Sequence, residues 1–104
     1  MEDISTIEFI ELLKKENHQC ILLDVREEIE FHTFNVGGTN LPLGQLHNAI
    51  ANEDLDFNHD DTIIAICQRG IRSKTAKTVL EQNGYKNVRN LLGGLLNLIR
   101  VKHQ

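Results

Sequence analysis

A short segment, Cys67-Gln68-Arg69-Gly70-Ile71-Arg72-Ser73, combines one nucleophile with two permanent positive charges. It follows the apolar run Thr62–Ile66 and precedes a stretch with helical spacing, so we expect it to join a strand to a helix. Gly70 permits a backbone conformation that other residues avoid. A loop of this length can turn several backbone N–H groups toward one point, and the positive end of the helix dipole strengthens that field. The pattern predicts an anion-binding loop with a thiol at its centre.

Cys67 is the expected reactive group of this loop. A thiol among backbone donors, a helix N-terminus and the guanidinium groups of Arg69 and Arg72 is expected to be largely thiolate near neutral pH, and therefore nucleophilic. The alternative is a small buried residue that ends a strand, but the neighbouring Gly70 and two arginines favour reactivity. Cys20 begins a strand without basic neighbours and is interpreted as structural. The two cysteines lie too far apart in the sequence for a Cys-x-x-Cys redox pair.

The elements that must position this loop alternate between helices and strands. Helices are predicted over residues 6–16, 27–34, 43–51, 73–83 and 95–101. Strands are predicted over residues 20–25, 39–41, 62–66 and 88–92. This order predicts an α/β fold with a central, mostly parallel sheet of four to five strands and helices on both faces. In such sheets the ligand site lies beyond the carboxyl ends of the strands, which is where Cys67 follows its strand.

Spacing also predicts caps and inward-facing side chains. Ser5 and Glu8 have the spacing of a capping box, and Gly84 is placed to end the helix that follows the reactive loop. The residues expected to face the core from the helices are Ile7, Ile10, Leu13, Ile29, Phe34, Leu46, Ala49, Ile50, Ala76, Val79 and Leu80.

The composition bounds the class of protein. With 104 residues, 40% of them hydrophobic and 25% charged, residues 1–104 are expected to form one soluble domain. No apolar run approaches the roughly 20 residues needed to span a bilayer. Met1–Glu11 carries four acids and no base, unlike a signal or transit peptide, so the cytoplasm is predicted. Two cysteines and five scattered histidines offer neither a disulfide framework nor metal-ligand spacing, so no metal or other cofactor is expected.

The charges are unevenly distributed. Residues 1–61 hold 14 acids and three bases, whereas residues 62–104 hold eight bases and one acid. This asymmetry indicates either an anion site in the second half or complementary faces within one domain. Aromatic residues total only 5%, without a basic patch among them, so nucleic acid is not an expected partner. The acidic stretch Glu53–Asp61 is interpreted as a solvated loop, with docking of a basic partner as the alternative.

Four segments, in order and at the right spacing, resemble the single-domain rhodanese (thiosulfate sulfurtransferase-like) family over nearly the whole chain. The segments are Leu22-Leu23-Asp24-Val25-Arg26-Glu27, Gly38-Thr39-Asn40-Leu41-Pro42, Cys67-Gln68-Arg69-Gly70-Ile71-Arg72-Ser73 and Leu92-Gly93-Gly94. Two positions depart from the family pattern: Asn35 stands where the family often has histidine, and Leu98 where it often has tryptophan. Both departures concern packing rather than the transfer chemistry.

The resemblance implies a sulfurtransferase with Cys67 as its catalytic residue. The Cys67 thiolate would take the outer sulfur of thiosulfate or a related anionic donor as a persulfide and pass it to cyanide or a thiol, without a metal. The substrate-binding residues implied are Gln68, Arg69, Gly70, Ile71, Arg72 and Ser73. Arg69 is the candidate for recognising thiosulfate, and Arg72 either does the same or pairs with a carboxylate beneath it. Asp24 and Arg26 are expected to organise the site or the fold rather than to react, with a purely structural ion pair as the alternative.

Two other functions are weighed against this one. Tyrosine and dual-specificity phosphatases place five residues between cysteine and arginine, whereas four stand between Cys67 and Arg72, which suits a single sulfur better than a phosphate or arsenate. The stronger alternative is a rhodanese-like sulfur carrier or protein-binding module with little thiosulfate turnover. In that case the donor or acceptor of sulfur would be a protein. No membrane partner is expected in either case.

Overall fold

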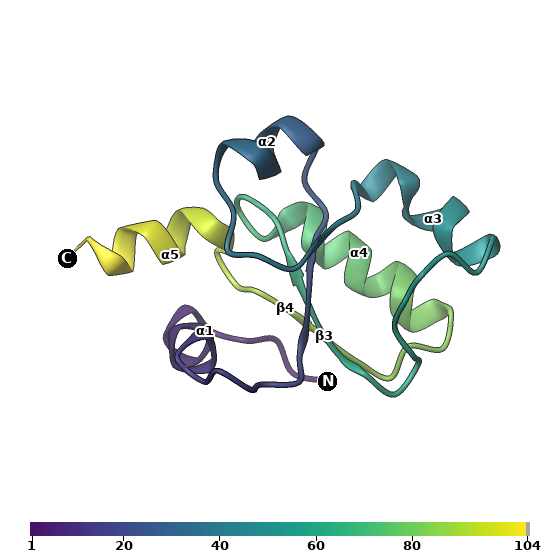
Figure 1. The fold of residues 1–104 in the computed structure, drawn as a ribbon, viewed down its shortest axis with the longest axis horizontal. Coiled ribbons are helices and arrows are strands. Elements are labelled where there is room, and N and C mark those ends of the chain that lie inside the picture. Colours follow the sequence, from purple (N-terminus) through teal and green to yellow (C-terminus); the bar gives the residue numbers. More distant parts are fainter. Residues whose placement is uncertain (104) are drawn as a thin grey trace.

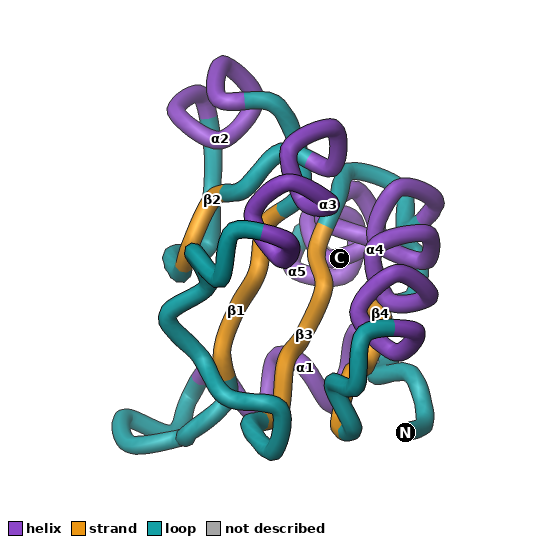
Figure 2. Tube along the Cα trace, turned by 90° about the vertical axis from the view of Figure 1, so that its right-hand side faces the viewer, coloured by secondary structure: helices purple, strands orange, loops and turns teal. Residues whose placement is uncertain are grey.

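Four short parallel strands form the centre of the molecule, and helices cover both faces of this sheet (Figures 1 and 2). The computed structural model describes residues 1–103. The strands are β1 (Ile21–Asp24), β2 (Thr39–Asn40), β3 (Thr62–Ile66) and β4 (Asn87–Asn90). Their order is β2-β1-β3-β4, and each neighbouring pair is parallel. A lone parallel bridge between Ile4 and Leu91 extends the sheet beyond β4. The predicted sheet is confirmed.

Five helices surround the sheet. They are α1 (Thr6–Leu13), α2 (Glu28–Thr33), α3 (Leu43–Ala51), α4 (Ile71–Gln82) and α5 (Gly94–Lys102). In Figure 2, α3 and α4 lie in front of the strands and α1 and α5 behind them, while α2 lies above the upper end of the sheet. That upper end is the carboxyl end of the strands, where the sequence predicts the ligand site.

The strand β3 contributes to an apolar core on each face of the sheet. Ile63 and Ala65 belong to the core beneath α3 and α4, whereas Ile64 and Ile66 belong to the core beneath α1 and α5. All four side chains are fully buried. An apolar run without alternation is typical of a parallel strand that is covered on both faces, and this explains the composition of the segment that leads to Cys67.

Three predicted inward-facing residues are wrong. Ile7 is 62% exposed, and Phe9 is the apolar residue of α1 that the core buries completely. Ile29 and Phe34 are 77% and 46% exposed. Periodicity assumes that a helix packs its apolar stripe on a sheet face, but α2 lies over the strand ends and buries none of its residues.

The predicted capping box at the start of α1 is half formed. The Ser5 hydroxyl accepts the backbone N–H of Glu8 at 3.1 Å, as expected. The Glu8 carboxylate, however, accepts a hydrogen bond from Arg89 of β4 at 2.8 Å. The predicted glycine at the end of α4 is confirmed. Gly84 follows this helix with φ of +90°, and the N–H of Tyr85 donates to the Leu80 carbonyl.

Ion pairs between the two halves of the sequence neutralise part of the charge asymmetry. Four of the eight bases in residues 62–104 pair with acids of residues 1–61. The pairs are Arg72–Glu30, Lys77–Asp3, Lys86–Asp60 and Arg89–Glu8. This favours the interpretation of complementary faces within one domain.

None of the helices within residues 1–103 has the length and hydrophobicity to cross a bilayer.

Candidate active site

Cys67 follows the last residue of β3, and its sulfur lies inside the turn that leads into α4. The backbone N–H groups of Gly70 and Ser73 point at Cys67 Sγ, with N···S distances of 3.1 and 3.3 Å. Gly70 is the N-cap of α4 and has φ of +86°, a conformation that glycine adopts without strain. The sulfur therefore occupies a helix N-terminus with two donors aimed at it, an arrangement that stabilises negative charge.

The N-terminus of α5 holds the other side of this loop. The N–H groups of Leu95 and Leu96 donate to the carbonyl oxygens of Cys67 and Gln68, both at 3.0 Å. A Cβ atom on Gly94 would lie 2.5 Å from the carbonyl oxygens of the same two residues. The close approach of α5 thus requires glycine at position 94, and the first two loop carbonyls are hydrogen-bonded to α5.

The buried residues Ser73 and Asn90 complete the surroundings of the sulfur. Ser73 Oγ lies 3.2 Å from Cys67 Sγ. The Ser73 hydroxyl also forms a short hydrogen bond with the side-chain oxygen of Asn90, at the end of β4. The Asn90 side-chain N–H donates to the Gly70 carbonyl at 3.1 Å. Asn90 therefore joins the cap of α4 to the residue beside the sulfur.

Arg26 and Asp24 form a buried ion pair beside the loop. Arg26 Nε lies 3.0 Å from Asp24 Oδ1, and Nη2 lies 2.9 Å from Oδ2. The same guanidinium donates to the Phe34 carbonyl at 2.6 Å and to the Gln68 side chain at 3.4 Å. Arg26 thus contacts β1, the end of α2 and the reactive loop, a geometry that fits the organising role expected from the sequence.

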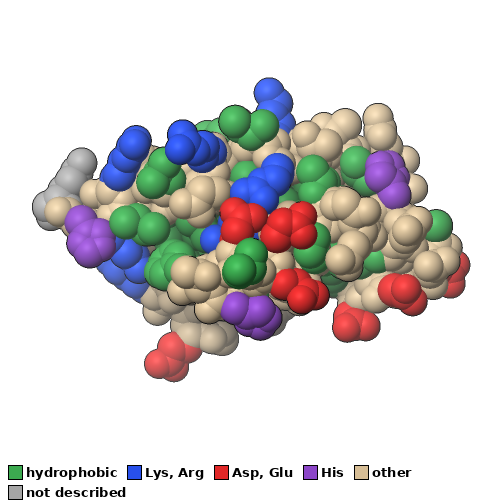
Figure 3. Space-filling model, turned by 90° about the horizontal axis from the view of Figure 1, so that it is seen from above, with side chains coloured by type: hydrophobic (Ala, Val, Ile, Leu, Met, Phe, Trp, Pro, Cys, Tyr) green, Lys and Arg blue, Asp and Glu red, His purple; other side chains and the backbone are tan. Residues whose placement is uncertain are grey.

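Arg72 is bound by Glu30 of α2. Its two terminal nitrogens lie 2.6 and 2.9 Å from the two carboxylate oxygens. These hydrogen bonds, together with one from the Glu27 backbone N–H, lower the pKa of Glu30 from 4.5 to about 2, and the bonds with Glu30 raise the pKa of Arg72. The structure thus shows a carboxylate partner for Arg72, which is one of the two roles that the sequence leaves open. Figure 3, a view onto the carboxyl end of the sheet, shows basic and acidic side chains in contact near the middle of this face.

The other loop residues differ in their exposure. Arg69 is exposed and forms no ion pair within residues 1–103. Ile71, the first residue of α4, is 72% exposed. Gln68 is half-buried and lines a hollow of about 370 Å³ together with Arg26, Glu30 and Phe34. Cys67 itself is fully buried and does not line this hollow.

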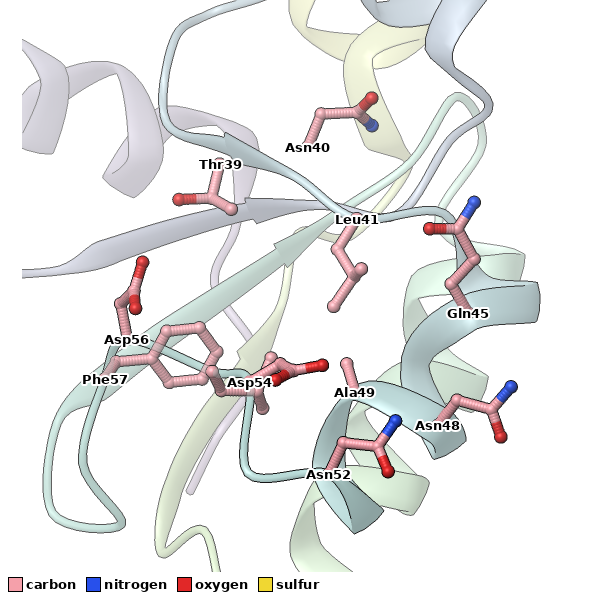
Figure 4. Close-up of a pocket in the computed structure, with 11 residues that line it drawn as sticks. Thr39, Asn40, Leu41, Gln45, Asn48, Ala49, Asn52, Asp54, Asp56 and Phe57 are labelled. Atoms are coloured by element: carbon pink, nitrogen blue, oxygen red, sulfur yellow. The ribbon is translucent and has the colours of Figure 1, made fainter.

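A second hollow, of about 410 Å³, lies away from the reactive loop (Figure 4). It is formed by β2, α3 and the segment that follows α3. Leu41, Ala49 and Phe57 lie around its apolar part, and Gln45 and Asn48 extend from α3 at its rim. No residue of the Cys67 loop lines it.

Within residues 1–103, no three His, Cys, Asp or Glu side chains gather in a way that could hold a metal ion.

Sequence reasoning missed two residues of this site, Glu30 and Asn90. Glu30 lies 42 residues from its partner Arg72, and nothing local distinguishes it from the other acids of α2. Asn90 carried a usable signal, because it is a polar residue at the carboxyl end of an otherwise buried strand in a predicted parallel sheet.

The chain belongs to the rhodanese family: the model of the rhodanese-like domain matches residues 5–99. Thiosulfate sulfurtransferase 18 of Arabidopsis thaliana is 36% identical over 95 residues, which are 81% of this chain and 68% of that protein. The mitochondrial thiosulfate sulfurtransferase RDL2 of Saccharomyces cerevisiae is 29% identical over 73% of this chain and 58% of its own length. The solved structure of SSP1007 from Staphylococcus saprophyticus has a TM-score of 0.80 and 29% identity, covering 94% of this chain and 93% of that one.

Other matched relatives have names that describe different activities. One, from Protochlamydia amoebophila, is a tRNA uridine(34) hydroxylase, and the name of another, from Bacillus subtilis, includes the words sulfur carrier protein. The chain spans between 31% and 61% of the length of the first four curated relatives that it matches. The comparisons therefore show the family and the fold. They do not assign one reaction, because the matched relatives carry names of different activities.

Proposed function

We propose that the protein is a sulfurtransferase that carries sulfane sulfur as a persulfide on Cys67. The observation that carries the proposal is the convergence of the Gly70 and Ser73 N–H groups on Cys67 Sγ at the N-terminus of α4. Donors fixed in this way stabilise a thiolate before the reaction and a persulfide anion after it. The sulfurtransferase names of relatives such as the Arabidopsis protein support the same activity.

The proposed reaction has two displacement steps. In the first, the Cys67 thiolate attacks the outer sulfur of thiosulfate, the S–S bond of the donor breaks, and sulfite leaves with the electron pair of that bond. In the second, cyanide or a thiolate attacks the outer sulfur of the persulfide, and the Cys67 thiolate is released. The two steps need neither a metal nor a general base, because each attacking group is already an anion and each leaving group, sulfite in the first step and the Cys67 thiolate in the second, departs as an anion. The exposed Arg69 is the proposed electrostatic contact for the donor anion.

Formation of thiocyanate from thiosulfate and cyanide tests the proposal. Cys67→Ser is expected to reduce the rate by about 10³-fold or more, as loss of a covalent nucleophile does. Cys20→Ser is the matched control, because Cys20 lies outside the loop, and we expect it to retain the rate of the unsubstituted protein. Activity that survives Cys67→Ser would contradict the proposed mechanism.

A sulfur carrier that exchanges sulfur with a protein is the second candidate. It is favoured by the complete burial of Cys67, because a bound protein can hold the loop in an open form that small donors rarely meet. Persulfide on Cys67 with a protein persulfide donor, but no thiocyanate from thiosulfate, is the outcome expected for a carrier. Mass spectrometry that detects a gain of one sulfur on the Cys67 peptide distinguishes the two candidates.

The cytoplasm is our proposed location. Two of the relatives are mitochondrial by their names, so imaging of the tagged protein at its natural level of expression is the appropriate test.

A further inference from the structure

Asn90 determines which way the Ser73 hydroxyl points beside the sulfur. The Asn90 side-chain N–H donates to the Gly70 carbonyl oxygen, which can only accept a hydrogen bond. The amide oxygen of Asn90 therefore faces Ser73, and it too can only accept. Because the Ser73 hydroxyl has one proton, that proton is directed to Asn90 and away from Cys67.

The direction of this proton distinguishes the thiol from the thiolate. Ser73 Oγ presents lone pairs to Cys67 Sγ at 3.2 Å, so a protonated thiol can donate to it. The hydrogen-bond chain from the thiol through Ser73 to Asn90 is then complete. No buried side-chain nitrogen or oxygen within residues 1–103 lacks a hydrogen-bond partner. A thiolate has no proton to donate and faces those lone pairs. To donate to the thiolate, the hydroxyl must turn away from Asn90 and leave a buried acceptor unpaired.

We propose that Asn90 is a positioning residue that disfavours loss of the Cys67 proton by directing the Ser73 hydroxyl away from the sulfur. When Cys67 loses its proton to solvent, the hydroxyl turns from the Asn90 oxygen to the sulfur. Asn90 thus opposes the N–H groups of Gly70 and Ser73, which favour the thiolate. The importance of this for catalysis rests on the proposed sulfur transfer, but the protonation of the sulfur can be measured without any sulfur donor.

The charged groups at this edge are separate from the Ser73–Asn90 contact. Arg26 is paired with Asp24 of β1, Arg72 of α4 with Glu30 of α2, and Arg69 is exposed. The first turn of α5 carries no charged side chain. On the far side of Asn90, its backbone N–H donates to Asp3, which is paired with Lys77. A substitution of the Asn90 side chain changes none of these ionisable groups, so a change in the behaviour of the sulfur is attributable to the hydrogen-bond chain.

The rate of Cys67 alkylation by iodoacetamide between pH 5 and 9 tests the proposal, with all variants in a Cys20→Ser background. The rate rises with the thiolate fraction and then reaches a plateau. Asn90→Leu removes the acceptor at similar volume, and we expect the midpoint of this profile to fall by about 0.5 to 1 pH unit, which makes alkylation about 3- to 10-fold faster below the midpoint. Asn87→Leu, at the opposite end of β4, is the matched control and is expected to leave the profile unchanged.

A double-mutant cycle separates this role from a general loosening of the loop. In a Ser73→Ala background the hydroxyl is absent, so Asn90→Leu is expected to leave the midpoint unchanged. A loosened loop would instead raise the plateau rate with or without Ser73. The proposal is overturned if the midpoint stays or rises in Asn90→Leu, or if it falls equally in the Ser73→Ala background. If circular dichroism shows that Asn90→Leu does not fold, Asn90→Val decides by the same criteria. Because no donor is present, neither result depends on whether thiosulfate is the substrate.

Discussion

Glu30 and Arg72, 42 residues apart in the sequence, are joined by two hydrogen bonds that connect α2 to the first turn of α4. This contact fixes the helix above the strand ends to the loop that contains Cys67. It also means that the guanidinium of Arg72 is already occupied by a carboxylate, whereas Arg69 extends into solvent. The two arginines of the loop therefore differ in their surroundings: Arg72 is paired with a carboxylate, and Arg69 is exposed and forms no ion pair within residues 1–103.

The Glu30–Arg72 pair is expected to make stability depend on pH in the acid range. Because the pKa of Glu30 is about 2 in the folded protein against an ordinary 4.5, the contribution is complete above pH 4.5 and is lost as the pH falls toward 2. Both side chains are about one-third exposed, so we expect Glu30→Gln to lower the free energy of unfolding by about 1 kcal/mol at pH 7. Urea unfolding at pH 7, 4.5 and 2.5 measures this.

The control for this pH dependence is Glu11→Gln, which removes an exposed pair with Lys14. It is expected to change the free energy of unfolding by less than about 0.5 kcal/mol at every pH. A difference between Glu30→Gln and the unsubstituted protein that stays constant from pH 7 to 2.5 would contradict the assignment of this contribution to the Glu30 carboxylate.

The sequence predicts the sheet well because the relevant signals are local. The run Thr62–Ile66 forms β3 over the predicted residues, and the helix Leu43–Ala51 has the predicted ends. The inward positions of α1 and α2 could not be predicted in the same way. Whether Ile7 or Phe9 is buried depends on how a helix is rotated against a sheet formed by distant residues, and Ile29 is exposed because α2 has no sheet face beneath it.

The candidate site likewise has a part that could be predicted from the sequence and a part that could not. Cys67, Gly70 and Ser73 stand within seven residues, so their convergence follows from the local turn and could be expected from spacing. The contacts of Arg72 with Glu30 and of Ser73 with Asn90 join segments separated by 42 and 17 residues. Such pairs are set by the order of strands and helices in space, and one sequence does not say which acid or amide meets which partner.

The buried Asp24–Arg26 pair is expected to stabilise the fold only while both partners are present. Asp24→Asn leaves a guanidinium buried without its counter-charge, which typically lowers the free energy of unfolding by about 3–5 kcal/mol. Replacing both residues, as in Asp24→Asn with Arg26→Met, is expected to be less damaging than the single change. Urea unfolding compares the two, and the exposed pair of Lys86 with Asp60 supplies a control, Asp60→Asn, with an expected change below about 0.5 kcal/mol. A single variant that is as stable as the double one would contradict this prediction.

Gly94→Ala is expected to displace the reactive loop from the end of α5. The new Cβ atom would lie 2.5 Å from the Cys67 and Gln68 carbonyls, and φ at this position is +62°. Because hydrogen bonds from the Leu95 and Leu96 N–H groups hold these two carbonyls against α5, we expect a loss of about 2 kcal/mol of stability together with a loss of sulfur transfer. Gly44→Ala in α3 is the matched control, because nothing lies within 4 Å of its new Cβ atom and the change favours the helix. Thermal unfolding and thiocyanate formation, measured on both variants, check the contrast; equal behaviour of the two would exclude a special role for Gly94.

Arg69→Ala is expected to weaken the use of thiosulfate without changing the fold. The side chain is exposed and forms no ion pair within residues 1–103, so its loss removes no internal contact of that kind. A guanidinium beside the loop attracts a doubly charged anion, and we expect kcat/KM for thiosulfate to fall about 5- to 10-fold, chiefly through KM. Because this attraction is screened by salt, the defect should shrink as ionic strength rises. Lys74→Ala, which removes an exposed base in the first turn of α4, is the control and is expected to have less than a twofold effect. If both substitutions reduce kcat/KM equally, the anion responds to the overall charge of this face, and Arg69 has no particular part in binding it.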